Sequence, residues 1–192
     1  MFGACPTNVS LTEVAEVTSG LTKNSKRETL PLRMPYLRVA NVFFDAIDTT
    51  EMLEIGLTEE ERDKTLLRYG DLLFVEGNGS PEQIGRVAIW RDEILSCVHQ
   101  NHLIKARFDT SRVIPSYAMH YFMSQEGRNQ IKSKAVSTSG LYTLSVSKIG
   151  DLRLPLPEIE SQAMFCDFVV QADKSKYVAQ KATTNIRTYG IL

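Results

Sequence analysis

A glycine-rich stretch of polar residues lies between two apolar runs at residues 75–90, VEGNGSPEQIGRVAIW. Base edges in the major groove of DNA present hydrogen-bond donors and acceptors. Amides can pair with adenine, arginine with guanine, and a carboxylate can accept from cytosine N4. The stretch supplies such groups at Glu76, Asn78, Ser80, Glu82, Gln83 and Arg86. Alternatively, the glycines only shape a long hairpin turn whose polar residues face water, and Arg86 braces that turn.

A second polar block, at residues 99–102, lies in a run that is otherwise apolar and strand-like. Such a block could face a nucleic-acid groove, or its histidines could pack against neighbours at a sheet edge. Two histidines three residues apart on a strand point to roughly opposite faces, which is a poor geometry for a shared metal ion. The block comprises His99, Gln100, Asn101 and His102.

A third polar set lies within residues 137–148, where no acid occurs. Its hydroxyls, backbone amides and lysine suit contacts with phosphate, although Tyr142 could instead belong to the core. Two residues of an earlier predicted strand, Arg38 and Asn41, could also reach DNA, or Arg38 could pair with an acidic segment at 45–63. The third set comprises Ser137, Thr138, Ser139, Tyr142 and Lys148.

Charge is unevenly distributed along a chain whose formal net charge is −1. Acids dominate residues 45–63, whereas residues 18–44, 94–108 and 127–150 carry Lys and Arg with few or no acids. If these three basic segments meet on one side of the fold, they form a positive face on which phosphate can dock. The alternative is that they scatter over a mixed, solvated surface.

Signatures of a self-contained enzyme are missing from the sequence. There is no Gly-x-Gly-x-x-Gly after a predicted strand, no Walker loop, no Gly-x-Ser-x-Gly elbow and no Asn-Pro-Pro-Tyr-type methyltransferase tetrad. A nuclease needs clustered carboxylates with a lysine, and the acids at 45–63 lack that pattern. The sequence therefore predicts no catalytic residue and no metal site.

The elements that would position these residues mix short helices and strands without regular alternation, which predicts an α+β fold with a mixed sheet. Ser10 to Glu13 match a capping box, so a short helix is expected from there to Gly20. Thr58 is expected to cap a second short helix. Further expectations are strands at 35–44, 72–75, 86–90 and 97–108, a turn at 69–71, a helix from Pro115 that includes Ile131, and a short element at 151–157.

The last part of the chain differs in composition. Residues 159–182 contain neither Gly nor Pro, which predicts one long helix there. Apolar and small residues recur there at alternating steps of three and four, a stripe that suits a partner helix but could also dock on the domain's own core. The stripe comprises Phe165, Phe168, Ala172, Ser175, Ala179 and Ala182. The expected division is a globular domain at 1–156 and a helical segment at 157–192.

The size and composition suit one ordinary domain, with 192 residues of which 43% are hydrophobic. Cys5, Cys97 and Cys166 form neither a disulfide framework nor a Cys-x-x-Cys pair, which favours a reduced, cytoplasmic setting. The sequence shows no signal peptide and no apolar run of about 20 residues, so no membrane segment is expected.

Several stretches occur in an order that resembles the specificity (S) subunit of type I restriction–modification systems. They are MPYLRVANV (34–42), LLRYGDLLFVEGNGSPEQIGRVAI (66–89), CVHQNHLIKARF (97–108) and the run from 114 to 162. The most telling pieces are Tyr69–Phe74, Gly85–Ala88, and Leu154–Pro157 leading to Gln162. The chain departs from the usual pattern at Ser161, where an acid is common, and at Tyr142-Thr143, where Pro-Asn is common.

The resemblance implies one target recognition domain followed by the conserved-region helix that joins such domains. It implies a non-catalytic subunit that reads one half of a split target in double-stranded DNA. Adenine methylation and DNA cleavage would come from methyltransferase and restriction subunits. Those partners would hold S-adenosylmethionine, ATP and magnesium, while this chain binds no cofactor.

One recognition domain and one helix correspond to half an S subunit. The chain is either a natural half-subunit that pairs with a copy of itself, and then reads a palindromic split site, or part of a longer chain. Phe165, Phe168 and Ala172 are assigned to helix pairing in both cases. The alternatives are a protein-interaction module that reads no DNA, and a stand-alone DNA-modifying enzyme.

Overall fold

The structure, a computed structural model, describes residues 7–188, without the side chains of Thr138, Ala179 and residues 182–188. Its helices are α1 (Glu59–Thr65), α2 (Pro115–Met123), α3 (Gln125–Lys134), α4 (Val146–Gly150) and α5 (Ile159–Thr188), with 3-10 turns η1 (Leu11–Glu13), η2 (Ser25–Thr29) and η3 (Val39–Asn41). Its strands are β1 (Asn8–Ser10), β2 (Ala15–Ser19), β3 (Leu32–Leu37), β4 (Leu53–Leu57), β5 (Leu72–Val75), β6 (Gly77–Asn78), β7 (Val87–Ile89), β8 (Val98–His99), β9 (Leu103–Phe108), β10 (Val136–Thr138), β11 (Leu141–Thr143) and β12 (Arg153–Pro155).

A four-stranded antiparallel sheet with the order β2-β9-β5-β7 forms the centre of the domain. Side chains alternate across a strand, so β5 serves two cores. Leu72 and Phe74 pack in the larger core with α2 and α3, while Leu73 and Val75 pack in a second core on the opposite face. All four residues of β5 are buried.

Three smaller sheets complete the fold. β4, β3 and β8 form one sheet, in which β3 runs antiparallel to β4 and parallel to β8. β10, β11 and β6 form another, and β1 pairs with β12. The α+β class with mixed strand directions, predicted from the sequence, is confirmed.

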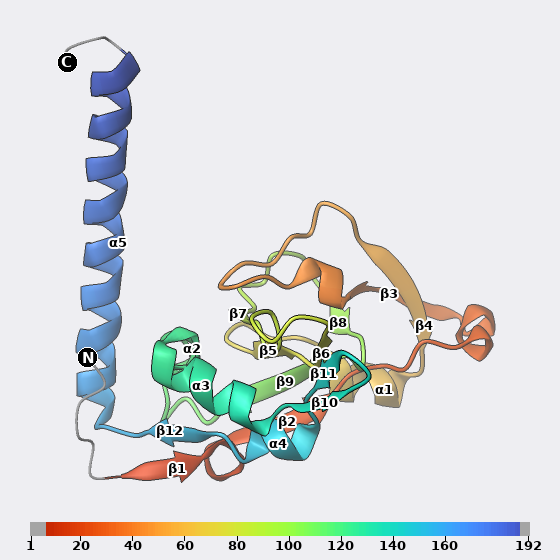
Figure 1. Ribbon diagram of the computed structural model, residues 1–192. Coiled ribbons are helices and arrows are strands. Elements are labelled where there is room, and N and C mark those ends of the chain that lie inside the picture. The colour runs from red at the N-terminus through yellow and green to blue at the C-terminus, as the bar shows by residue number, and fades with distance from the viewer. Residues whose placement is uncertain (1–6, 189–192) are drawn as a thin grey trace.

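The long helix α5 stands at the edge of the domain as a rod and extends away from it (Figure 1). Its first turns contact the domain at α2 and at the segment just before α2, where Gln162 bonds with Ile114 and Arg112. The predicted boundary at 156/157 falls between β12 and α5, and the division into two domains stays a prediction. Within the described residues, no helix is long and apolar enough to cross a membrane.

The predicted opening helix at 10–20 is wrong. The capping box forms, with Ser10 N donating to Glu13 Oε1 over 2.7 Å, but the helix ends after the single turn η1. The following residues form β2 and pair with β9 over five positions. Tertiary pairing of β-branched Val17 and Thr18 in a sheet outweighs the helical spacing of the local sequence.

Two longer elements are also corrected. The predicted strand at 97–108 is two strands in different sheets, β8 and β9, separated by a turn at Asn101-His102. The predicted helix from Pro115 past Ile131 is broken at Ser124, whose hydroxyl accepts from Gly127 N over 3.3 Å and caps α3. Gly127 is required at that bend, because a Cβ there would lie 2.2 Å from the carbonyl oxygen of Tyr121.

Other local expectations are confirmed. α1 begins with a Thr58–Glu61 capping box, a turn occupies Tyr69-Gly70, and β5 pairs with β7 across the glycine-rich stretch. The predicted strand at 35–44 is partly right, because β3 ends at Leu37 and η3 follows it.

Candidate nucleic-acid interface

The glycine-rich loop at residues 76–86, here called the reading loop, is the point at which the three basic segments meet. Glu76 N donates to His102 O over 3.0 Å, and Leu144 N donates to Glu76 O over 2.8 Å. His102 Nδ1 also lies 2.7 Å from Glu76 Oε2. From the basic segment at 18–44, Val39 O accepts from Arg86 Nη2 over 3.3 Å. All three basic segments therefore contact this loop. Such a meeting is the condition under which their composition predicts a shared positive face.

The first half of the reading loop forms a small sheet with the third polar set. Asn78 lies opposite Tyr142, and Gly77 lies opposite Thr143, while Tyr142 in turn lies opposite Ser137 (Figure 1). Tyr142 is half-buried and packs partly against the main core, which supports the core interpretation of this residue, and its contact with phosphate stays a prediction. The sheet places two of the three predicted polar sets side by side.

The second half of the reading loop is held from beneath by Arg128 of α3. Its guanidinium donates to the carbonyl oxygens of Gly85, Ile84 and Glu82 over 2.9, 2.7 and 3.2 Å. Burial lowers the pKa of Arg128 from its ordinary value. Gly85 has φ +60°, and a Cβ there would lie 2.3 Å from Ile131 Cγ2, so the loop can close on α3 only with glycine at this position.

Arg86 braces the loop at its exit. Its Nη1 donates to Gln83 Oε1 over 3.2 Å, and its guanidinium lies 5.7 Å from the ring centroid of Phe43. The Nε atom is buried without a hydrogen-bond partner in the described structure, and burial lowers the pKa of the side chain. This geometry supports the bracing interpretation of Arg86, and base contact by Arg86 stays a prediction.

Three predicted residues lie in the interior or in internal contacts. Asn41 is 4% exposed, and its amide accepts from Arg38 N and donates to Asp48 O and Glu51 O. Arg38 pairs with Glu51 at 3.5 Å, as the alternative for that residue expected. His99 is fully buried. Contact of Asn41 or His99 with DNA would need the surrounding fold to open.

His99 is held as a neutral ring. Its Nδ1 lies 3.1 Å from the carbonyl oxygen of Leu103, which can only accept, so Nδ1 carries the proton. Its Nε2 is buried without a partner in the described part of the chain. Burial and the nearby Lys105 ammonium lower the pKa of His99 to about 3.

Other predicted residues are accessible. His102, Ser137 and Ser139 are exposed, and Gln100, Asn101 and Lys148 are half-buried. The side chains of Gln100, Asn101 and Lys148 form no hydrogen bond with the described residues. The side chain of Thr138 lies outside the described residues.

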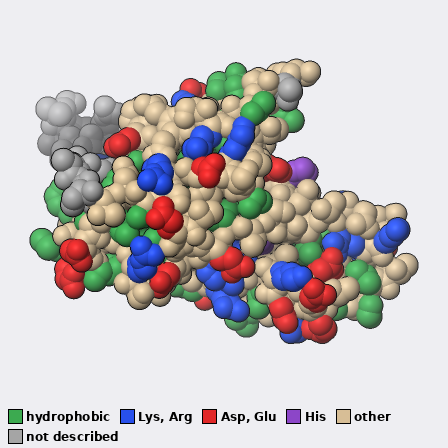
Figure 2. Space-filling model, turned by 90° about the horizontal axis from the view of Figure 1, so that it is seen from below, with side chains coloured by type: hydrophobic (Ala, Val, Ile, Leu, Met, Phe, Trp, Pro, Cys, Tyr) green, Lys and Arg blue, Asp and Glu red, His purple; other side chains and the backbone are tan. Residues whose placement is uncertain are grey.

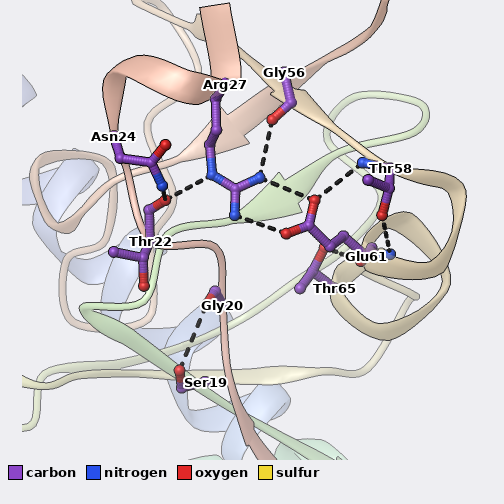
Figure 3. Close-up of polar contacts among 9 residues, drawn as sticks. All are labelled: Ser19, Gly20, Thr22, Asn24, Arg27, Gly56, Thr58, Glu61 and Thr65. Carbon is purple, nitrogen blue, oxygen red and sulfur yellow. Dashed lines mark hydrogen bonds and ion pairs between the residues drawn. The ribbon is translucent and has the colours of Figure 1, made fainter. Parts of the chain in front are cut away.

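Many cations of the basic segments serve the fold. Arg27 forms a bidentate pair with Glu61 at 2.8 and 3.0 Å and also donates to Gly56 O and Thr22 O (Figure 3). The hydrogen bonds that Glu61 accepts from Arg27 and from Thr58 N lower the pKa of its carboxyl group. Arg33, Arg38, Arg107 and Lys132 are also in ion pairs, with Glu54, Glu51, Asp71 and Glu82.

The charged side chains on one face of the molecule are mixed in sign (Figure 2). On the face seen in Figure 2, blue and red side chains alternate without a region of one sign. Among the cations of the three segments, the ammonium groups of Lys23, Lys26, Lys134 and Lys148 have neither an ion pair nor a hydrogen bond with the described residues, whereas Lys105 and Arg128 bond to carbonyl oxygens. Any positive face is therefore narrower than the composition suggested. Among the described residues, no group of three or more His, Cys, Asp or Glu side chains could hold a metal ion.

Sequence reasoning missed the aromatic residues beside the reading loop. Phe43 is 46% exposed beneath Arg86, and the guanidinium of Arg128 lies 5.1 Å from the Phe44 ring centroid. It also missed the buried position of Arg128, one of the cations of the basic segment at 127–150. The sequence held one signal for the exposed aromatic pair, which is two adjacent phenylalanines next to an acidic segment. It held no local signal for the carbonyl groups that Arg128 binds.

The helix stripe divides into two parts. Phe165 packs against Tyr117 and His120 of α2, with ring centroids 5.6 and 6.2 Å apart, so it docks on the domain's own core. Phe168 is 57% exposed, and Ala172 is half-buried. The side chains of Ala179 and Ala182 lie outside the described residues. Further along, α5 exposes Tyr177 and Val178.

Comparison with known proteins gives a consistent result, although no protein-family model matches the chain. The chain is 28% identical over 151 residues to the type I restriction enzyme EcoKI specificity subunit of Escherichia coli K12, which covers 78% of this chain and 32% of the relative. It is 24% identical over 135 residues to the type I restriction enzyme StySPI specificity subunit of Salmonella potsdam. That match covers 70% of this chain and 29% of the relative. The chain thus spans about a third of the length of these relatives.

Solved structures share the fold. A structure described as the basis of complex assembly and conformational transition of the type I R-M system matches with a TM-score of 0.65 and 18% identity, over 92% of this chain and 40% of that one. The crystal structure of the HsdS subunit from Thermoanaerobacter tengcongensis matches with a TM-score of 0.58 and 15% identity, over 92% and 39%. The chain therefore has homologues among type I restriction enzyme specificity subunits and adopts the fold of HsdS structures, as its sequence motifs indicated.

Proposed function

We propose that this chain is a DNA-reading specificity subunit, or half of one, that reads one half of a split target in double-stranded DNA. The observation that carries the proposal is that the second and third polar sets both contact the reading loop, which holds the first set, at Glu76 and Asn78. Amide, hydroxyl and arginine side chains on a loop fixed by Arg128 have the chemistry that base reading needs.

The proposal assigns no chemistry to this chain. Adenine methylation and DNA cleavage would be performed by methyltransferase and restriction subunits, which would supply S-adenosylmethionine, ATP and magnesium. The recognition domain would direct those partners to the target, because its loops fix the register on the duplex.

The exposed part of α5 supports a partner helix. Met164, Phe168 and Val178 are 73%, 57% and 65% exposed, and their spacing along α5 places them on one face, where they can pack against a second helix. We assign this surface to pairing with a second recognition unit, supplied by another copy of the chain or by the rest of a longer one.

The test is DNA binding and methylation by the chain assembled with its methyltransferase partner. We expect methylome sequencing of cells carrying the intact system to show adenine methylation at a split motif. We expect exchange of residues 76–86 for the loop of another specificity subunit to change one half of that motif, or both halves where the second recognition unit is another copy of the chain. Methylation that is unchanged by loop exchange would instead support the protein-interaction module.

A further inference from the structure

The reading loop uses the oxygen atoms of its polar side chains internally. Asn78 Oδ1 accepts from Ser80 N over 2.9 Å, and Ser80 Oγ accepts from Glu82 N over 3.2 Å. Gln83 Oε1 accepts from Arg86 Nη1 over 3.2 Å. A backbone N–H and a guanidinium can only donate, so chemistry fixes which end of each amide faces inward.

The nitrogen ends of these amides remain available. Asn78 Nδ2 and Gln83 Nε2 have no hydrogen-bond partner among the described residues, and neither is among the buried atoms that lack a partner. Both nitrogens are therefore in reach of a ligand. The Ser80 hydroxyl, which already accepts, can still donate its own hydrogen.

The two carboxylates of the loop also have partners within the protein. The Glu76 carboxylate lies against His102, and the Glu82 carboxylate pairs with Lys132 at 2.6 Å. Arg86 carries donors only. The loop thus offers a ligand amide and hydroxyl donors, while its carboxylates face protein cations or histidine.

We infer that the reading loop selects acceptor edges, so that Asn78 and Gln83 read guanine. This inference rests on the proposed function. Guanine presents two acceptors, N7 and O6, and no donor in the major groove, so one amide NH2 group can bond to both. Thymine presents a single acceptor, O4, beside its methyl group, and cytosine N4 and adenine N6 are amino donors.

A bidentate contact with adenine needs the amide oxygen and nitrogen of one side chain to face the base together. At Gln83 the oxygen lies against the Arg86 guanidinium, so an adenine amino group would approach a cation. At Asn78 the oxygen is turned toward the backbone of the loop. The internal hydrogen bonds therefore act against adenine at both positions.

The experiment uses the chain assembled with its methyltransferase partner and a pool of DNA duplexes with a randomised centre. Bound duplexes are sequenced for the wild type, Gln83→Glu, Asn78→Asp and Gln83→Met. We expect guanine at fixed positions of the wild-type half-site. Gln83→Glu and Asn78→Asp replace a donor by an acceptor, so each should lower the preference for guanine over cytosine at one position by about tenfold.

Gln83→Met removes the donor without adding an acceptor. The preference for guanine at that position should therefore fall, while the share of cytosine among bound duplexes should not rise above that of the other bases. Gln125→Glu on α3 is the matched control, because it makes the same charge change at an exposed helix position and should alter no base preference. Circular dichroism checks that each variant folds.

The outcomes separate the two proposals. A wild-type motif whose base preferences are unchanged in all three loop variants overturns the guanine assignment and leaves the proposed function standing. Loss of adenine preference in Gln83→Glu or Asn78→Asp overturns the assignment as well. Binding of the wild type without any motif overturns both.

Discussion

Arg128 is a buried cation whose hydrogen-bond partners are carbonyl oxygens of the reading loop. Replacing it with methionine leaves those oxygens unpaired in a buried site, which should lower the free energy of unfolding by about 3 kcal/mol. Equilibrium unfolding in urea measures the change. Lys132→Met is the control, since the Lys132–Glu82 pair is at the surface and should contribute less than about 1 kcal/mol. Equal losses in the two variants would contradict this role of Arg128.

The buried His99 makes stability depend on pH. Its pKa is about 3 in the folded chain and 6.5 as an ordinary value, so the unfolded chain binds a proton that the folded chain excludes. Stability should therefore be complete above pH 6.5 and fall as pH decreases toward 3, by up to about 1.4 kcal/mol per pH unit from this group.

Urea unfolding between pH 6.5 and about 4.5 tests this, with His99→Gln expected to flatten the dependence on pH. His102→Gln is the control, because His102 is exposed. A histidine NMR titration in which the His99 resonance shifts with a midpoint near 6.5 would argue against the buried, neutral ring.

The position of the reading loop could be predicted from the sequence, because glycines and short polar side chains between two apolar strands form a local pattern. The interior positions of Asn41 and His99 were not predictable in the same way. Each is fixed by groups distant in the chain or around a turn, such as the carbonyl oxygens of Asp48, Glu51 and Leu103. Local sequence carries no signal of that kind.

At the scale of elements, Gln162 fastens α5 to the domain. It is fully buried, accepts from Ile114 N over 2.9 Å, and donates to Arg112 O and Pro157 O over 2.9 and 3.0 Å. Gln162→Leu should leave these backbone groups unpaired and loosen the first turns of α5, with a loss of about 2 kcal/mol in unfolding free energy.

Hydrogen exchange should show faster exchange at Ile114 and in the first turns of α5 in Gln162→Leu. Gln171→Leu, at an exposed position of the same helix, should leave exchange at Ile114 unchanged. Unaltered protection of Ile114 in Gln162→Leu would contradict this role of Gln162.

Two of the helices were predicted correctly from the sequence. The Thr58 cap and the absence of Gly and Pro from 159–182 are local signals, and α1 and α5 form as predicted. β2 and the break between α2 and α3 depend on pairing with β9 and on the close approach of Gly127 to Tyr121. A capping box or apolar spacing cannot report such contacts.

For the whole molecule, the arrangement of charge decides how salt should affect DNA binding. Lys134 ends α3 and Lys148 lies in α4, on either side of the β10–β11 hairpin that carries Ser137 and Tyr142. Neither ammonium has an ion pair among the described residues, so both are free to contact phosphate. Other cations near the loop, Lys132 and Arg128, are committed to the fold.

The double variant Lys134→Ala/Lys148→Ala should therefore weaken binding equally for all sequences. It should reduce the slope of log affinity against log salt by up to about 1.8, since each phosphate contact on duplex DNA contributes about 0.9. Binding by the assembled complex at several salt concentrations measures this slope. Lys176→Ala on α5 is the control, because Lys176 pairs with Asp173 on the projecting helix. A changed base preference with an unchanged slope would mean that these lysines read bases and do not hold phosphate.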